Sequence, residues 1–98
     1  MDLTSQLTQL NGQPILGGDK QPATIATCSI EALLSPRQED DGVTKIRKAI
    51  LAEKIFTHPS HVAMTTAEAA MLSECLQEFC SPLALIQCLR VIDPEKLK

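Results

Sequence analysis

The strongest hydrophobic periodicity lies in the last third of the chain. Between residues 66 and 80, apolar side chains recur at spacings of three and four, as they do along one face of an α-helix. Thr65 precedes Glu68 by three residues, and the two form a capping box in which each side chain can accept a hydrogen bond from the other's backbone N–H. The pattern therefore predicts a helix over residues 66–80.

A second helix is expected directly after the first. Ser81 offers an N-cap hydroxyl, and Pro82 suits the first helical position because that position needs no N–H. The apolar face then continues to about residue 93, where Pro94 ends the helix. We expect the core of this helical hairpin around the Ser-Pro joint, where Phe79→Ala should cost about 3–5 kcal/mol. The side chains expected inside are Phe79, Leu83, Ile86 and Leu89.

Two more helices are predicted upstream, over residues 24–34 and 42–57. Thr24 can cap the first of them. The second has apolar positions at Val43, Ile46, Ala49, Ile50, Ala52 and Ile55. Between the two helices, residues 36–42 read PRQEDDG and form a charged connector that we expect to be solvated.

The first 23 residues have a different pattern, with two short, weakly alternating runs on either side of Asn11-Gly12. Asn-Gly is a strong signal for a two-residue hairpin turn, because both of its positions want positive φ. We therefore predict a small β-hairpin that pairs residues 4–8 with 13–16, followed by a loop. A two-stranded hairpin is marginal alone in water, so it has to pack on the helices or pair with another chain.

Composition agrees with a helical fold. The chain has 98 residues, of which 44% are hydrophobic and only 2% aromatic, so its core must be aliphatic. We expect a mainly α protein, a compact bundle of about four helices with a small N-terminal β-hairpin. Residues 1–98 form a single domain in this interpretation, with the hairpin and loop in 1–23 and the helical part in 24–98.

The net charge of −3 argues against a surface for nucleic acid, which would need clustered Lys and Arg. No run of 18 apolar residues and no basic leader with an apolar stretch is present, so we expect a soluble, unexported protein without a membrane partner. One local basic patch lies on the polar face of helix 42–57. It is either a solvated helix face or a docking patch for an acidic partner, and its residues are Lys45, Arg47, Lys48 and Lys54.

The four cysteines occupy apolar positions of the predicted helices and are expected to be reduced core residues. They are Cys28, Cys75, Cys80 and Cys88. A zinc site that joins them to His58 or His61 is disfavoured, because no C-x-x-C pair is present and Cys75 and Cys80 lie about 140° apart around a helix. We expect neither a metal nor a cofactor.

Two other chemical alternatives are weaker. Cys80 could pair with His58 or His61 as a nucleophile and base, but burial raises the pKa of a cysteine and no oxyanion-stabilising loop is evident. The acidic residues 39–41 could bind a divalent cation, although a solvated cluster before a helix N-terminus explains them as well. We therefore expect no enzymatic activity.

Several phrases in this order resemble a group of small proteins of tailed bacteriophages and prophages. The phrases are LTQLNGQPI, SIEALLSP, TKIRKAILAEKIF and MTTAEAAMLSECLQEFCSPLALIQCLRVID. The matching residues are Asn11, Gly12, Pro14, Ile15, Leu33, Leu34, Lys54, Ile55, Thr66, Glu68, Pro82 and Leu83. The chain departs from the group at Ile86-Gln87, where members often have Gly-Gln, and in its additional cysteines. The resemblance implies a phage or prophage origin and a non-enzymatic character, and it transfers no catalytic residue.

The expected function is contact with another protein, in phage particle assembly or as a minor structural component. An exposed edge of the predicted hairpin could add to a partner's sheet or to a second copy, which makes a homo-oligomer possible. The alternative is a small phage-encoded regulator or inhibitor that binds a host protein through the basic helix face or the connector. Either protein would work in the cytoplasm of the bacterial host, and the first also in the virion.

Overall fold

Four α-helices account for most of the described chain. The computed structural model describes residues 1–17, 20–35 and 37–97. The helices are α1 (Ile25–Leu34), α2 (Gly42–Thr57), α3 (Thr66–Phe79) and α4 (Pro82–Ile92), followed by the 3-10 helix η1 (Pro94–Leu97). The mainly α fold class is confirmed, and each helix lies close to its predicted range.

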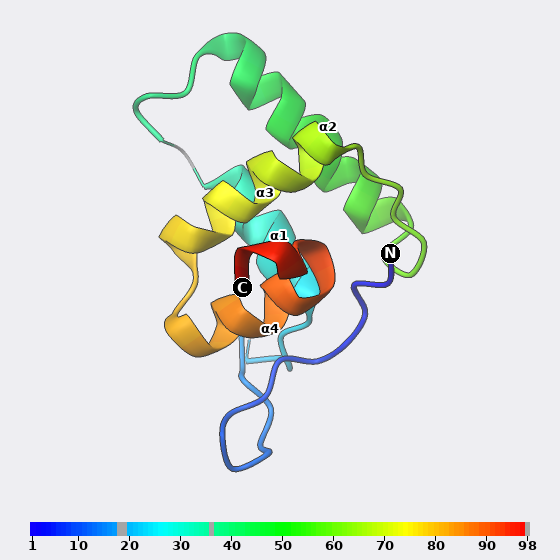
Figure 1. Ribbon diagram of the computed structural model, residues 1–98, viewed down its shortest axis with the longest axis vertical. Helices are drawn as coiled ribbons and strands as arrows, with labels where there is room; N and C mark the ends of the chain where they lie inside the picture. Colours follow the sequence, from blue (N-terminus) through cyan, green and yellow to red (C-terminus); the bar gives the residue numbers. More distant parts are fainter. Residues whose placement is uncertain (18–19, 36, 98) are drawn as a thin grey trace.

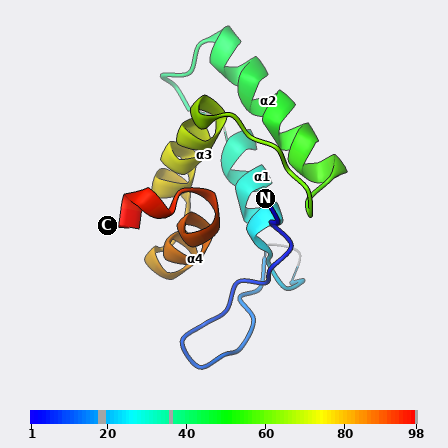
Figure 2. The ribbon, with the colours of Figure 1, turned by 45° about the vertical axis from the view of Figure 1, so that its right-hand side comes forward.

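Helix α1 occupies the centre of the molecule and contacts α2, α3 and α4 (Figure 1). Helix α2 forms an outer layer on one side of α1, and α3 and α4 form the expected helical hairpin on the other (Figures 1 and 2). The radius of gyration is 12.8 Å, close to the ~13 Å of a compact domain of about 100 residues. The arrangement is therefore three helices packed around a fourth.

Local capping explains where the helices begin. Thr65 Oγ1 accepts from Glu68 N at 3.1 Å, and Glu68 Oε1 accepts from Thr65 N at 3.0 Å, so the predicted capping box is present. Thr24 forms a similar reciprocal pair with Thr27 at the start of α1. Ser81 stands at the N-cap of α4 but makes no capping hydrogen bond with its side chain, contrary to expectation. Proline at the first helical position begins α4 without it.

The predicted β-hairpin between residues 4–8 and 13–16 is not formed as a pair of strands. The described N-terminal residues make three isolated antiparallel bridges: Gln6 with Thr24, Thr8 with Pro14, and Leu16 with Pro22. Two of the bridges involve proline, which has no N–H with which to extend a ladder. A turn is present, in which the Gly12 N–H donates to the Gln9 carbonyl at 3.0 Å, but of the two predicted positions only Gly12 has a positive φ, of +85°, so this is not the expected two-residue Asn-Gly turn.

The N-terminal segment packs on the helices instead of forming a sheet. Leu3 and Leu7 are fully buried in the core. The backbone N–H of Leu3 donates to the Pro59 carbonyl, and that of Leu7 donates to the Ala23 carbonyl, each at 2.8 Å. Figure 2 shows this segment running past one end of α1. These contacts replace the predicted strand pairing as the anchor of the N-terminus.

The core is aliphatic, as the composition predicts, but Phe79 does not belong to it. Phe79 is 44% exposed, and the other phenylalanine, Phe56, is 78% exposed. Leu72 and Leu76 of the same α3 stripe are fully buried. Phe79 is the last residue of α3, beyond the part of the stripe that the core covers. Of the other residues expected inside, Leu89 is buried, whereas Leu83 and Ile86 are half-buried.

Most described residues of the connector before α2 are exposed, as expected, but ion pairs hold it in place and bury the Asp40 side chain. Residue 36 of the predicted connector lies outside the described residues. The ammonium of Lys48 pairs with the Asp40 carboxylate, and the two side chains are only 5% and 9% exposed. Arg37 Nη2 lies 2.8 Å from Glu78 Oε1 on α3. Asp41 caps α2 through its side chain. Asp40 and Asp41 therefore have separate structural roles and do not converge on a cation.

We expect truncation of Leu76 to destabilise the protein far more than truncation of Phe79. Leu76→Ala should lower the free energy of unfolding by about 2–5 kcal/mol, because it opens a cavity in the core. Phe79→Ala should lower it by about 1 kcal/mol, since Phe79 is nearly half exposed. Urea unfolding followed by circular dichroism measures both, and equal losses would contradict this core.

Loss of one partner of the buried ion pair should also be costly. Lys48→Met leaves the Asp40 carboxylate buried without a counter-charge and should lower the free energy of unfolding by about 3–5 kcal/mol. Lys45→Met, at an exposed position of the same helix, should change it by less than about 0.5 kcal/mol. Adding Asp40→Leu to Lys48→Met should recover most of the loss. Urea titrations that show no difference between the two single variants would refute the buried pair.

Candidate functional site

The basic residues predicted as a docking patch lie on α2 but do not form one exposed surface. Lys48 is 4% exposed and is paired with Asp40, so it faces the interior. Lys54 Nζ lies 3.2 Å from Glu68 Oε1. The Thr65 backbone N–H and the Lys54 ammonium keep the pKa of the Glu68 carboxyl below its usual value. Of the four candidates, the structure leaves Lys45 and Arg47 exposed.

An apolar stripe faces outward on the same helix. Val43, Ile46 and Ile50 are 59%, 61% and 57% exposed, and their spacing of three and four places them on one side of α2. The residues of α2 that pack inward lie on roughly the opposite side, and they include Leu51, Ala52 and Ile55. We call the stripe of Val43, Ile46 and Ile50 the outer face of α2. The sequence pattern predicted these three residues, together with Ala52 and Ile55, as apolar positions of one helix, and the structure places Ala52 and Ile55 inward and the outer face outward.

Grooves border α2 on two sides. One groove of about 460 Å³ lies between α2 and the beginning of α3. It is lined by Arg47, Ile50, Thr65, Ala67, Glu68 and Met71. A second groove of about 420 Å³ lies between α2 and α1, where Leu34 and Phe56 expose 59% and 78% of their surface. Exposed apolar surface therefore extends from the outer face of α2 toward both neighbouring helices.

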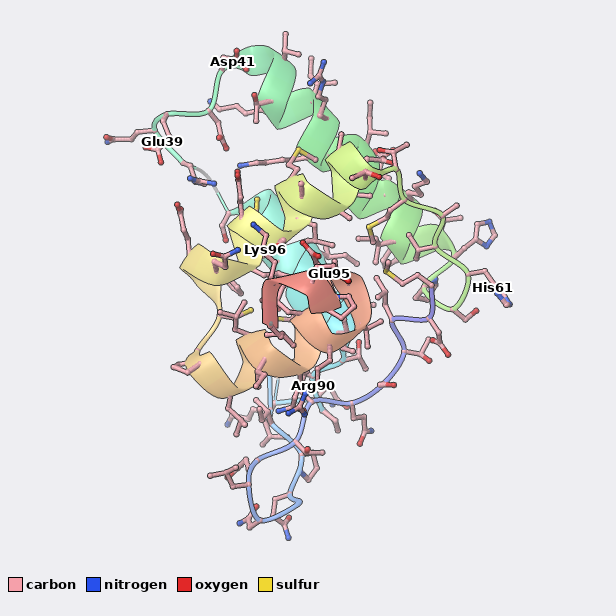
Figure 3. All side chains as sticks on the ribbon, viewed as in Figure 1. Glu39, Asp41, His61, Arg90, Glu95 and Lys96 are labelled. Atoms are coloured by element: carbon pink, nitrogen blue, oxygen red, sulfur yellow. The ribbon has the colours of Figure 1, made fainter. Side chains whose placement is uncertain are left out.

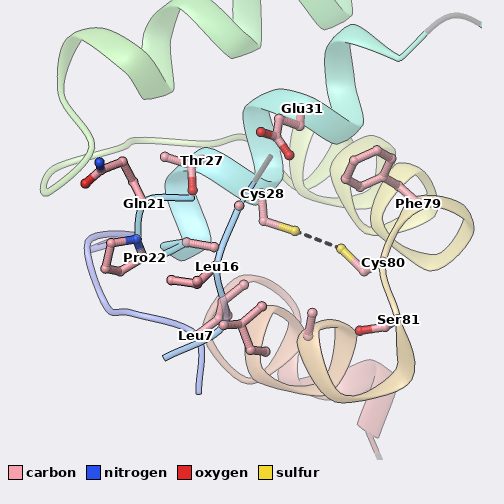
Figure 4. Close-up of a pocket in the computed structure, with 14 residues that line it drawn as sticks. Leu7, Leu16, Gln21, Pro22, Thr27, Cys28, Glu31, Phe79, Cys80 and Ser81 are labelled. Atoms are coloured by element: carbon pink, nitrogen blue, oxygen red, sulfur yellow. Dashed lines mark hydrogen bonds between the residues drawn. The ribbon is translucent and has the colours of Figure 1, made fainter. Parts of the chain in front are cut away.

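A second candidate site is a cluster of three thiols from different parts of the chain. Cys28 of α1, Cys80 at the C-terminus of α3 and Cys88 of α4 have Sγ atoms that all lie within 4.8 Å of one another. The Cys28 and Cys80 sulfurs are 2.9 Å apart (Figure 4). Cys28 and Cys88 are buried, and Cys80 is half-buried. Within the described residues, this is the only group of three or more metal-ligating side chains that are close enough to share an ion.

The cluster opens onto a cavity of about 320 Å³. Cys28 and Cys80 line it together with Glu31 and Phe79 (Figure 4). The position of Phe79 in the cavity wall explains why this residue is partly exposed and does not fill the core. Of the two cysteines, Cys80 is half-buried and lies nearer to solvent than Cys28.

Hydrogen bonds within the cluster shift the pKa values of the three thiols in different directions. Thiol hydrogen bonds from Cys28 and Cys88 lower the pKa of Cys80 to about 4, while the hydrogen bond to Cys80 raises the pKa of Cys28 to about 12. The pKa of Cys88 is also raised, by its hydrogen bonds to Cys28 and Cys80. The cluster therefore favours one thiolate, on Cys80. Burial does raise the pKa of Cys80, as expected, but the hydrogen bonds from the other two thiols lower it by more.

The cluster could not be found from spacing in the sequence, because its cysteines are not close in the chain. The separation between Cys28 and Cys80 is 52 residues, and α1 brings them together by packing against the helical hairpin. Cys75 is buried outside the cluster. His58 and His61 are exposed in the loop between α2 and α3, where Figure 3 shows His61 projecting from the molecule. The Cys–His pairs considered from the sequence are therefore not brought together.

In the described part of the chain, no helix has the length and apolar character needed to cross a membrane. Comparison of the chain with protein-family models, with curated proteins and with solved structures gave no match. The resemblance to small phage proteins therefore stays a prediction from the sequence, and the residues of the structure itself must carry the functional interpretation.

Proposed function

We propose that the protein is a non-catalytic interaction module that binds another protein through the outer face of α2. The observation that carries this proposal is the exposure of more than half of Val43, Ile46 and Ile50 in one row. Side chains at helix positions i, i+3 and i+7 are the usual anchors of a helix that lies in a partner's groove. A partner that covers them removes aliphatic surface from water, which favours binding.

Charge around the outer face supports a partner with an acidic rim. Arg47 is exposed and shares a groove with Ile50. Lys45 adds a second exposed positive charge to α2. Complementary charge at the rim of an apolar contact speeds association and selects between partners. We therefore propose an apolar groove flanked by Asp and Glu as the complementary surface.

The resemblance noted in the sequence supports a setting for this interaction. We propose that the partner is a phage structural protein, so that the chain acts in particle assembly or as a minor component of the virion. The alternative partner is a host protein that the chain regulates or inhibits in the bacterial cytoplasm. The same outer face of α2 serves both, and the identity of the captured protein distinguishes them.

Charged substitutions on the outer face should abolish binding without unfolding the protein. We expect the double variant Ile46→Glu/Ile50→Glu to lose at least about tenfold in affinity, because it places two charges in the apolar contact and repels an acidic rim. Its free energy of unfolding should change by less than about 1 kcal/mol, since both positions are more than half exposed and Glu is a good helix former.

The matched control is Leu10→Glu, which changes a 93% exposed leucine in the N-terminal turn. Immobilised protein would be exposed to lysate of phage-infected bacteria, and the captured protein would be purified and titrated by calorimetry. Retention by the parent chain and the Leu10→Glu control, but not by the double variant, supports the proposal. Equal retention by all three proteins would contradict it.

A further inference from the structure

We propose that Cys28, Cys80 and Cys88 bind one zinc ion as three thiolate ligands, with the carboxylate of Glu31 as the fourth. The proposal rests on the convergence of the three sulfurs and on the cavity that Glu31 shares with two of them. None of these four residues belongs to the outer face of α2, so the zinc proposal does not depend on the proposed function.

The spacing of the sulfurs suits a tetrahedral ion. Zn–S bonds of about 2.3 Å place neighbouring sulfurs of a tetrahedral site about 3.8 Å apart. The three Sγ atoms lie within 4.8 Å of one another, and the Cys28–Cys80 pair is 2.9 Å apart. Side-chain movements of about 1 Å would bring all three to the required spacing. No backbone rearrangement of the helices is needed.

The origin of the ligands also points to a structural metal. The three cysteines come from α1, from the end of α3 and from α4, so a bound ion would tie the central helix to both arms of the helical hairpin. A disulfide would use only two sulfurs and leave the third as a spectator. A shared ion, unlike a disulfide, would use all three sulfur atoms.

Glu31 completes the donor set. It follows Cys28 by one turn of α1 and lines the same cavity as Cys28 and Cys80 (Figure 4). Its carboxylate is not among the ligand atoms that all lie within 4.8 Å of one another, so its side chain would have to turn toward the sulfurs to bind the ion. A carboxylate oxygen is an accepted zinc ligand, whereas copper(I) prefers sulfur alone, so the mixed donor set favours zinc.

Binding would make all three sulfurs thiolates, and the protons of the remaining thiols would leave to solvent. No oxidation state changes. The burial of Cys28 and Cys88 would shield the ion from water on one side, with Glu31 on the open side toward the cavity. A closed four-ligand site of this kind stabilises a fold and leaves no position for a substrate.

Metal analysis of the full chain tests the proposal. The protein would be produced in zinc-supplemented medium and purified under reducing conditions without chelator, and zinc would be measured by plasma mass spectrometry. We expect about one zinc ion per chain. Cys75→Ser is the matched control, because Cys75 is buried in α3 outside the cluster. It should retain the zinc, while Cys28→Ser and Cys88→Ser should lose it.

A second measurement keeps the proposal testable if the cysteine variants fail to fold. Titration of the reduced parent protein with cobalt(II) should give the near-ultraviolet charge-transfer absorption of thiolate ligands and the visible bands of a tetrahedral ion. Glu31→Gln, at an exposed position, should weaken zinc binding about tenfold or more, a loss seen even for residues that only orient a ligand. An unchanged affinity in this variant would overturn the assignment of Glu31.

Three results would overturn the zinc site itself. The first is a reduced, folded protein that contains no zinc and shows no thiolate absorption with cobalt(II). The second is stoichiometric copper in place of zinc. The third is a mass two hydrogens lower with a Cys28–Cys80 cross-link after purification without reductant, which would assign the cluster to a disulfide.

Discussion

The packing of α1 between α2 and the helical hairpin is the constraint on which the rest of the structure depends. This helix has ten residues and would not be stable alone in water. It is covered on several sides instead, and its buried residues are Ile25, Ala26, Cys28, Ser29, Ala32 and Leu33. Most of them are small, which lets the neighbouring helices approach closely. The tertiary contacts of α1 therefore supply the stability that its length does not.

Both candidate sites follow from this central position. Because α2 rests on α1 by one stripe, its second apolar stripe of Val43, Ile46 and Ile50 faces outward. Because α1 also meets α3 and α4, Cys28 lies beside Cys80 and Cys88. The first site is a surface suited to another protein, and the second is an interior cluster suited to an ion. They occupy different residues, so one can be altered while the other is kept.

Local signals in the sequence predicted the helices well, because caps and prolines act on their immediate neighbours. The capping box of Thr65 and Glu68 marks the start of α3, and Pro82 marks the start of α4. Neither signal depends on what the helix packs against. Asn11-Gly12 marked the place of a turn, but only Gly12 has the predicted positive φ. Strand pairing beyond the turn depends on a ladder that Pro14 and Pro22 interrupt.

The candidate sites depend on tertiary contacts that periodicity cannot resolve. Helix α2 carries two apolar stripes, and only the position of α1 decides that Ile46 is exposed and Ile55 buried. Lys48 is counted as a surface charge in the sequence but has a buried partner in the connector. Cys28 and Cys80 are similarly joined only by the packing of α1 against the hairpin. Long-range packing, not local pattern, sets these features.

Hydrogen–deuterium exchange of the full chain, read by mass spectrometry, tests the central role of α1 most directly. If α1 depends on all of its neighbours, its backbone amides are released only when the whole molecule unfolds, and we expect them among the slowest to exchange. The amides of residues 8–14, in the exposed N-terminal turn, should exchange fastest. Exchange of α1 as fast as that turn, under conditions in which α3 stays protected, would contradict the central packing.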